Sequence, residues 1–163
     1  MVALRCTQRL LSRLHVASPS EPGESTTTLG DWYANTLMIA RRPYVMCTSE
    51  RSKLTVIIPF KGATTLRERF RNAVGALLHA IHIPASVIED ELKEMDPIEF
   101  GRTRNRSLLG NMKDLTLPAE DWLLDHPEST LLDIDVRLSK HLVGPDPYVV
   151  PRELALKILT GAA

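Results

Sequence analysis

The sequence of 163 residues contains only two cysteines, few aromatic residues and no net charge. Cys6 and Cys47 stand far apart, so they form neither a disulfide framework nor a zinc-binding set, and we expect a cytoplasmic protein. The 20 Lys and Arg residues balance 20 Asp and Glu residues, so no overall field attracts the chain to nucleic acid or to an anionic membrane. No apolar run is long enough to cross a bilayer.

The N-terminal segment contains arginines but no acidic residue before Glu21. An Arg-rich and Ser-rich segment without acids is typical of an organelle transit peptide. The run from Val2 to Cys6, however, has the pattern of a first strand that leads into a short amphipathic helix over residues 8–15. We favour the strand and helix.

The composition, 44% hydrophobic and 25% charged, is that of an ordinary globular protein. A chain of this length is expected to form one domain, residues 1–163. Residues 18–29 combine Pro, Gly, Ser and Thr with almost no apolar side chain, so we predict a flexible loop there.

The hydrophobic pattern predicts strands first and helices afterwards. Short polar connections between successive strands favour antiparallel pairing. We therefore predict an α+β fold, a single domain with a mainly antiparallel β-meander sheet covered by several helices. The expected strands are residues 2–7, 31–41, 44–48, 54–60 and 97–100, with alternate residues of 54–60 on opposite faces. The expected later helices start at Thr65 (a capping box with Glu68), Ala85 (with Pro84 suited to its first turn), Thr116, Ser129 and Pro151. In the helix after Thr65 an apolar stripe runs from Leu66 to Ile81, and in the helix after Ser129 the spacing of Asp133 and Arg137 predicts an ion pair.

The most distinctive stretch is the arginine row, which we define as Arg102, Arg104 and Arg106. Alternating positions in an extended segment share one side, and guanidinium groups bind phosphate or carboxylate through paired hydrogen bonds. A candidate anion site therefore contains the three arginines with Asn105 and Lys113, and Arg5, Arg9 and Arg13 extend the basic patch. The alternative is an exposed edge strand whose charges prevent sheet-to-sheet pairing.

No catalytic or metal-binding motif stands out in the sequence. Ser107 lacks the preceding glycine of a nucleophile elbow, and Gly101 and Gly110 do not have the spacing of a phosphate-binding loop. His79 and His82 lack a carboxylate partner nearby in sequence. We therefore expect no catalytic residue, no metal and no cofactor, and Gly101 is expected to allow a bulge or a close backbone approach beside the strand.

Three groups of residues resemble an uncharacterised bacterial family, a domain of unknown function. These groups are LRCT at 4–7 with Leu10 and Leu11, GDWYAN at 30–35, and NRSLLG at 105–110 with Met112 and Asp114. The resemblance spans most of the chain. It implies a single domain and no assigned activity.

Three functions remain open on these grounds. We favour a non-enzymatic binding or adaptor module that recognises a protein partner, because no catalytic constellation is present. The first alternative is a nucleic-acid-binding protein that uses the arginine row, although the neutral net charge counts against it. The second is an enzyme acting on a phosphorylated or anionic small molecule, with Asn105 and Asp114 as polar partners.

Overall fold

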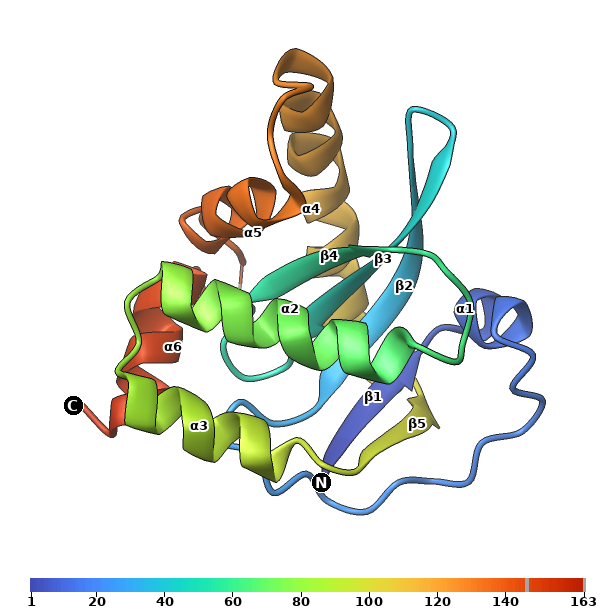
Figure 1. Cartoon of the computed structure of the whole chain (residues 1–163), viewed down its shortest axis with the longest axis horizontal. Coiled ribbons are helices and arrows are strands. Elements are labelled where there is room, and N and C mark those ends of the chain that lie inside the picture. The colour runs from blue at the N-terminus through green and yellow to red at the C-terminus, as the bar shows by residue number, and fades with distance from the viewer. Residues whose placement is uncertain (146, 163) are drawn as a thin grey trace.

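The computed structural model describes residues 1–145 and 147–162 and has one five-stranded sheet with helices on both faces (Figure 1). The strands are β1 (Val2–Cys6), β2 (Trp32–Ile39), β3 (Arg42–Ser49), β4 (Thr55–Pro59) and β5 (Ile98–Arg102). Their order across the sheet is β4-β3-β2-β1-β5. The α+β class is therefore confirmed.

The sheet is mixed, so the predicted antiparallel meander is only partly right. β2, β3 and β4 are antiparallel neighbours, but β1 is parallel to both β2 and β5. Residues 7–31 separate β1 from β2, and this connection is long enough to return the chain to the same end of the sheet. The short connections on which the prediction depended join only β2, β3 and β4.

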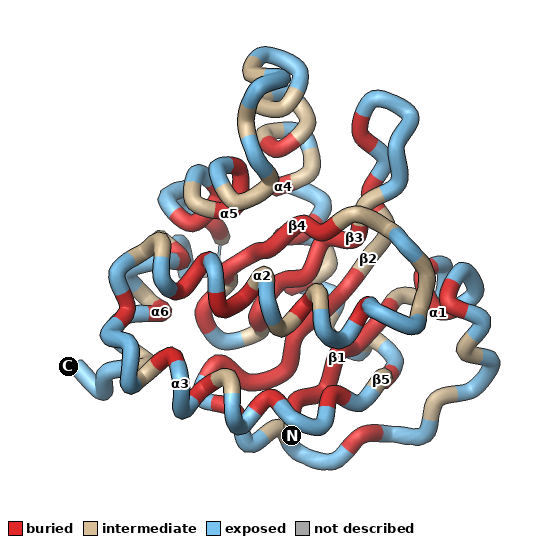
Figure 2. Tube along the Cα trace, viewed as in Figure 1, coloured by how far each residue is buried: buried red, intermediate tan, exposed pale blue. Residues whose placement is uncertain are grey.

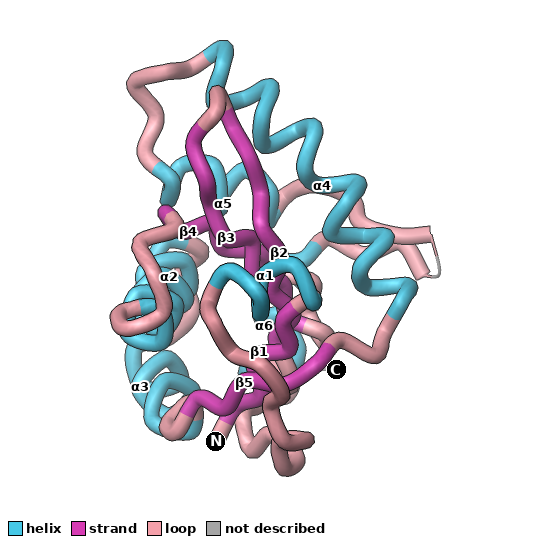
Figure 3. The backbone as a smooth tube through the Cα atoms, turned by 90° about the vertical axis from the view of Figure 1, so that its right-hand side faces the viewer, coloured by secondary structure: helices cyan, strands magenta, loops and turns pink. Residues whose placement is uncertain are grey.

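Each face of the sheet packs against its own helices (Figure 3). On one face lie α1 (Gln8–Arg13), α2 (Leu66–Ala80), α3 (Ala85–Glu94) and part of α6 (Pro151–Thr160). The other face is covered by α4 (Arg106–Asp125) and by residues of α5 (Leu131–Ser139). The sheet is therefore buried between two apolar layers, as the buried strands in Figure 2 show.

Helix α2 buries the predicted apolar stripe, with Leu66, Phe70 and Val74 at most 1% exposed. The Phe70 ring meets Trp32 of β2 edge to face, with 5.3 Å between the ring centroids. The predicted capping box is wrong, because the Thr65 side chain makes no cap hydrogen bond. Its hydroxyl instead accepts a hydrogen bond from Nε of Arg69 at 3.0 Å.

Helix α4 is one continuous helix, although we expected a new helix after Thr116. Pro118 lies inside it, and the Thr116 hydroxyl donates to the carbonyl of Met112 at 3.2 Å. Burial of one face of α4 against the sheet holds the helix together across the proline. The buried residues on that face are Leu108, Met112, Leu115 and Ala119.

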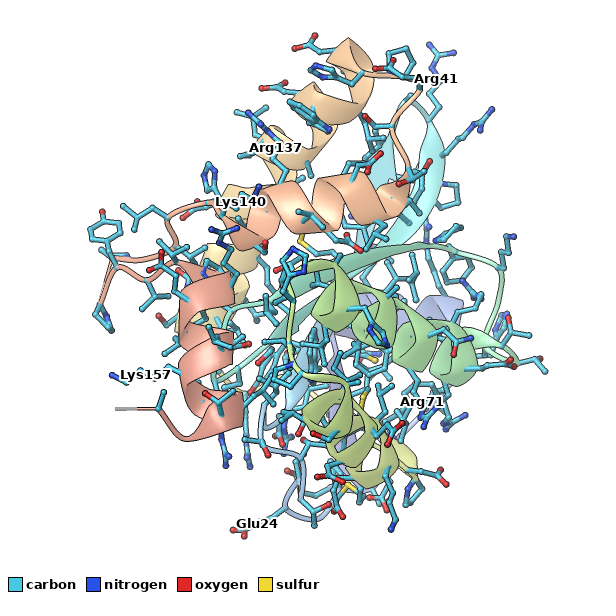
Figure 4. All side chains as sticks on the ribbon, turned by 60° about the vertical axis from the view of Figure 1, so that its left-hand side comes forward. Glu24, Arg41, Arg71, Arg137, Lys140 and Lys157 are labelled. Carbon is cyan, nitrogen blue, oxygen red and sulfur yellow. The ribbon has the colours of Figure 1, made fainter. Side chains whose placement is uncertain are left out.

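Helix α5 begins one residue later than predicted, and its cap is Thr130 rather than Ser129. Thr130 and Asp133 form a reciprocal capping box. Arg137 therefore does not form the predicted ion pair with Asp133, and its guanidinium lies 3.9 Å from the ring centroid of Trp122. Figure 4 labels Arg137 where α5 meets α4.

The connecting segment, which we define as residues 16–26, joins α1 to the start of β2 without helix or strand. It passes outside β5 (Figures 1 and 3). Residues 18–29 contain no helix or strand, and their flexibility stays a prediction. Among the helices that the structure describes, none is both long and apolar enough to span a membrane.

Candidate functional site

The predicted arginine row does not form one extended strand. β5 ends at Arg102, and the Asn105 side chain accepts a hydrogen bond from the backbone N–H of Leu108 at 3.0 Å. Asn105 is thus the N-cap of α4, and Arg106 is already the first residue of a helix. The expected alternation of three arginines along one strand is therefore wrong.

The five predicted ligand-binding residues do not line one site. Arg104 lies near acidic groups, with N···O distances of 3.4 Å to Glu21 and 3.6 Å to Asp31. Arg102 and Arg106 are exposed and form no ion pair within residues 1–145 and 147–162. Lys113 lies two turns further along α4, in the wall of a separate cavity of about 200 Å³ beside β2.

Arg5 was expected to extend an exposed basic patch, and this expectation is wrong. Its side chain is buried on the α4 side of the sheet, where it donates to the carboxylates of Asp31 at 2.6 Å and Glu21 at 2.8 Å. A third donor reaches the carbonyl of Arg102 at 3.0 Å. Burial alone would lower the pKa of Arg5, but the hydrogen bonds to Glu21 and Asp31 raise it.

The contacts of Arg5 hold the connecting segment against the sheet. Ser25 donates to Asp31 at 2.6 Å and accepts from the backbone N–H of Ala3 at 2.9 Å. Pro22 packs on Gly101, where a Cβ atom would lie 2.8 Å from the proline ring, so the predicted close approach at Gly101 is confirmed. We call Arg5, Glu21, Asp31 and Arg104 the Arg5 cluster; its two cations and two anions balance.

Sequence reasoning missed the Arg5 cluster, although one signal was present. Arg5 is the one charged side chain in an otherwise apolar strand, and a charged group there requires a buried partner. The hydroxyl of Tyr33, beside Arg5 in the register of β1 and β2, is buried and has no hydrogen-bond partner in the part of the chain that the structure describes. Burial, and then the charge of Glu50, raise the pKa of Tyr33.

The outer edge of β5 is a second feature that the sequence did not reveal. The N–H of Val2 bonds to the carbonyl of Pro97, so in the parallel register the N–H and C=O groups of Ile98, Phe100 and Arg102 point away from β1. Two of these carbonyl groups accept hydrogen bonds from side chains. Arg67 Nε donates to the carbonyl of Ile98 at 2.9 Å, and the guanidinium of Arg5 donates to the carbonyl of Arg102. Within the described residues the N–H groups of Ile98, Phe100 and Arg102 and the C=O of Phe100 have no partner.

Two hollows, which we together call the β5 groove, lie along this edge and meet at Arg67 and Ile98. The first has about 500 Å³ and lies between Phe100 and the connecting segment at Val16 and Pro19. The second has about 470 Å³ and is lined by charged side chains of α2 and the α3–β5 region. These are Arg67, Glu68, Arg71, Lys93 and Asp96. Figure 4 labels Arg71 where α2 and α3 meet.

The opposite edge of the sheet, at β4, is covered by a helix. The buried carboxylate of Asp135 accepts the N–H of Ile57 at 2.9 Å, and Pro59 has no N–H to offer. Helix α5 lies along this strand (Figure 1). An exposed edge is prone to pair with other chains, and proteins usually cover it. The two edges therefore differ, because α5 covers β4 whereas β5 borders a groove.

The part of the chain that the structure describes contains no group of three or more His, Cys, Asp or Glu residues placed to hold a metal ion. Burial raises the pKa of the Cys6 thiol to about 12. Cys47 is also buried, and burial raises its pKa well above the ordinary value. Both cysteines are therefore packed as small apolar groups rather than poised as thiolates.

Comparisons with known proteins identify a family without an assigned activity. Neither a curated protein nor a solved structure matches the chain. A family model described as a domain of unknown function (DUF6933) matches residues 3–154. The match includes all five strands except the first residue of β1, helices α1 to α5, and the first turn of α6. The chain therefore belongs to the DUF6933 family.

Proposed function

We propose that this protein is a non-enzymatic module that binds an extended segment of a partner protein along the β5 groove. The observation that carries the proposal is the difference between the two sheet edges. Helix α5 covers the β4 edge and Asp135 accepts the N–H of Ile57, while four backbone groups on the outer edge of β5 have no partner among the described residues. An added strand supplies the missing hydrogen bonds, which is the basis of recognition by β-augmentation.

The two hollows would give such an interaction its specificity. The hollow between Phe100 and Val16 suits an apolar side chain, since alternate residues of an added strand point to the same side. The other hollow contains three cations and two acids. None of Arg67, Arg71 and Lys93 forms an ion pair with a residue that the structure describes, so this end favours an acidic residue.

Arg67 lies at the centre of the groove and is the residue to change. It donates to the Ile98 carbonyl, and its guanidinium lies 4.0 Å from the centroid of the Phe100 ring. In the absence of a partner, Arg67 covers part of the edge. With a partner bound, its charge can pair with an acidic side chain. The balanced Arg5 cluster, by contrast, gives no observation that favours nucleic acid.

The experiment is selection of a random peptide library, of segments about 12 residues long, on the immobilised full chain. Selected peptides are then titrated against the wild type, Arg67→Glu and Arg152→Glu, a matched control on the exposed surface of α6. We expect Arg67→Glu to weaken binding by at least about tenfold and Arg152→Glu to leave it unchanged.

Hydrogen exchange of backbone amides provides a second test of the site. A bound strand should slow exchange of the Phe100 and Arg102 amides, which point away from β1 at the edge of the sheet. The proposal is overturned if the selection yields no binding peptide. It is also overturned if selected peptides bind Arg67→Glu as tightly as the wild type and leave these two amides unaffected.

A further inference from the structure

A separate cavity of about 260 Å³ lies where α2, α5 and β4 meet. Strand β4 is one edge of the sheet, and β5 is the other. The wall of the cavity is largely apolar. The apolar lining includes Ile58, Pro59, Ala73, Ala76, Leu131 and Leu132. An apolar cavity of roughly 150 Å³ holds a benzene molecule, so this one is large enough for a single ring with a short chain.

Asp135 is the buried charged group of this cavity. Asp135 is 2% exposed, and its Oδ1 accepts a hydrogen bond from the N–H of Ile57 at 2.9 Å. Oδ2 accepts no hydrogen bond from the described residues, and Asp135 is one of the residues that line the cavity. Burial raises the pKa of Asp135 well above its ordinary range, because one N–H donor compensates the buried charge only in part.

Arg69 is the other charged residue in the wall, and its guanidinium is held by the protein. Its Nε donates to Thr65, and the other two nitrogens donate to the carbonyls of Pro59 and Gly62. Those partners lie in the segment before α2 and at the end of β4. Asp135 therefore has no cationic partner among the described residues.

We propose that this cavity binds a small apolar amine, whose ammonium group pairs with Oδ2 of Asp135 while its ring or branched chain contacts the apolar wall. A cation within a few ångströms supplies the compensation that a buried carboxylate lacks. Ligand sites of this kind are concave and mostly apolar, with one or two polar groups that fix the orientation. The proposal does not depend on the function of the β5 groove.

The test uses benzylamine and cyclohexylmethylamine as probes, with benzyl alcohol as the uncharged isostere of the first. Amide chemical shifts of the full chain are followed by NMR during titration. We expect the amines to shift the amides of Ile57, Ala76 and Leu132, and benzyl alcohol to bind at least about tenfold more weakly.

Two variants make the test specific. Asp135→Asn keeps an oxygen for the N–H of Ile57 and should lose the preference for amine over alcohol, whereas Asp121→Asn, on the exposed surface of α4, should keep it. Ala76→Leu places a larger side chain at the cavity and should weaken binding of every probe. The proposal fails if amine and alcohol bind equally to the wild type, if Asp135→Asn retains the preference, or if no probe shifts these amides.

Discussion

At the scale of single residues, Arg5 shows how a charged side chain is accommodated within a buried strand. A buried ion pair does not by itself make a protein more stable than an apolar pair would, because both ions lose their hydration. Removing one partner is different, since it leaves the other charge buried and uncompensated. Asp31 is 7% exposed and accepts both Arg5 and Ser25, so it depends on Arg5 in this way.

We therefore expect Arg5→Met to lower the free energy of unfolding by about 3–5 kcal/mol, the usual cost of breaking a buried pair. The double variant Arg5→Met/Asp31→Asn should recover part of this loss, because the unpaired charge is gone. Urea denaturation of both variants measures the effect, with Arg9→Met on the exposed side of α1 as the control. A double variant whose loss equals the sum of the two single losses would show that Arg5 and Asp31 are not energetically coupled.

At the scale of elements, α5 covers the β4 edge of the sheet. Its first turn is fixed by the Thr130 capping box, and one turn further Asp135 reaches the N–H of Ile57. The helix also contacts α4 through Arg137 and Trp122. This arrangement buries an ionisable group, which gives the stability of the protein a predictable dependence on pH.

The pKa of Asp135 is higher in the folded protein than in the unfolded chain, so between the two values the folded state binds more protons. Stability contributed by this group is therefore present at low pH and is lost as the pH rises through that window. We expect the free energy of unfolding of Asp135→Asn to increase relative to the wild type as the pH rises from about 4, the ordinary pKa of an aspartate. Urea denaturation at several pH values measures this difference, and Asp121→Asn gives the background slope. A difference that falls with rising pH would contradict the prediction.

Helix α4 carries a second feature at this scale, the proline in its interior. Pro118 cannot donate to the carbonyl four residues earlier, and its ring crowds that carbonyl. The distal part of α4 also leaves Leu117 63% exposed and Leu124 56% exposed, so little burial offsets the loss there. Figure 2 shows much of this end of α4 as exposed.

Replacing Pro118 by alanine should raise the free energy of unfolding by about 1–3 kcal/mol, since the helix gains a hydrogen bond and loses a clash. Part of the gain is offset by the greater freedom of the unfolded chain. Thermal and urea denaturation measure the change, and Leu117→Ala serves as a neighbouring exposed control. A loss of stability in Pro118→Ala would mean that the proline is needed for packing against α5.

At the scale of the whole molecule, the connecting segment links the two faces of the sheet. It leaves α1 on the α2 side and reaches the opposite side at Glu21 and Pro22, so it passes around the end of β5. Residues 17, 18 and 20 are exposed, while Pro22 is buried on Gly101. The segment is thus accessible to solvent around residues 17–20 and is held against the sheet at Pro22.

A protease of broad specificity should therefore cut first within residues 17–20 of the native protein, because exposed backbone without regular structure is cleaved most readily. The two fragments should stay together in size-exclusion chromatography, since β1 remains paired between β2 and β5. Mass spectrometry identifies the cut. First cleavage inside residues 66–81 would contradict this account of the molecule.

The sequence by itself determined the elements whose cause is local. The alternation in residues 54–60 predicted the two faces of β4, and the apolar spacing from Leu66 to Leu78 predicted the buried face of α2. Local signals were less reliable at helix ends, because Thr65, Thr116 and Ser129 all suit a cap, and burial of the neighbouring face decides where a helix begins.

Only the tertiary structure decided the direction of β1 and the residues that surround β5. A long connection is compatible with either strand direction, and the choice depends on where the rest of the chain packs. The pairing of Arg5 with Glu21 and Asp31 joins residues far apart in sequence. Because Asn105 is the N-cap of α4, Arg106 lies in the helix and Arg102 in β5, so the arginine row is not one segment. The β5 groove likewise depends on α2, α3 and the connecting segment meeting along one strand. Such sites arise from packing between distant segments, and no spacing within a single segment encodes them.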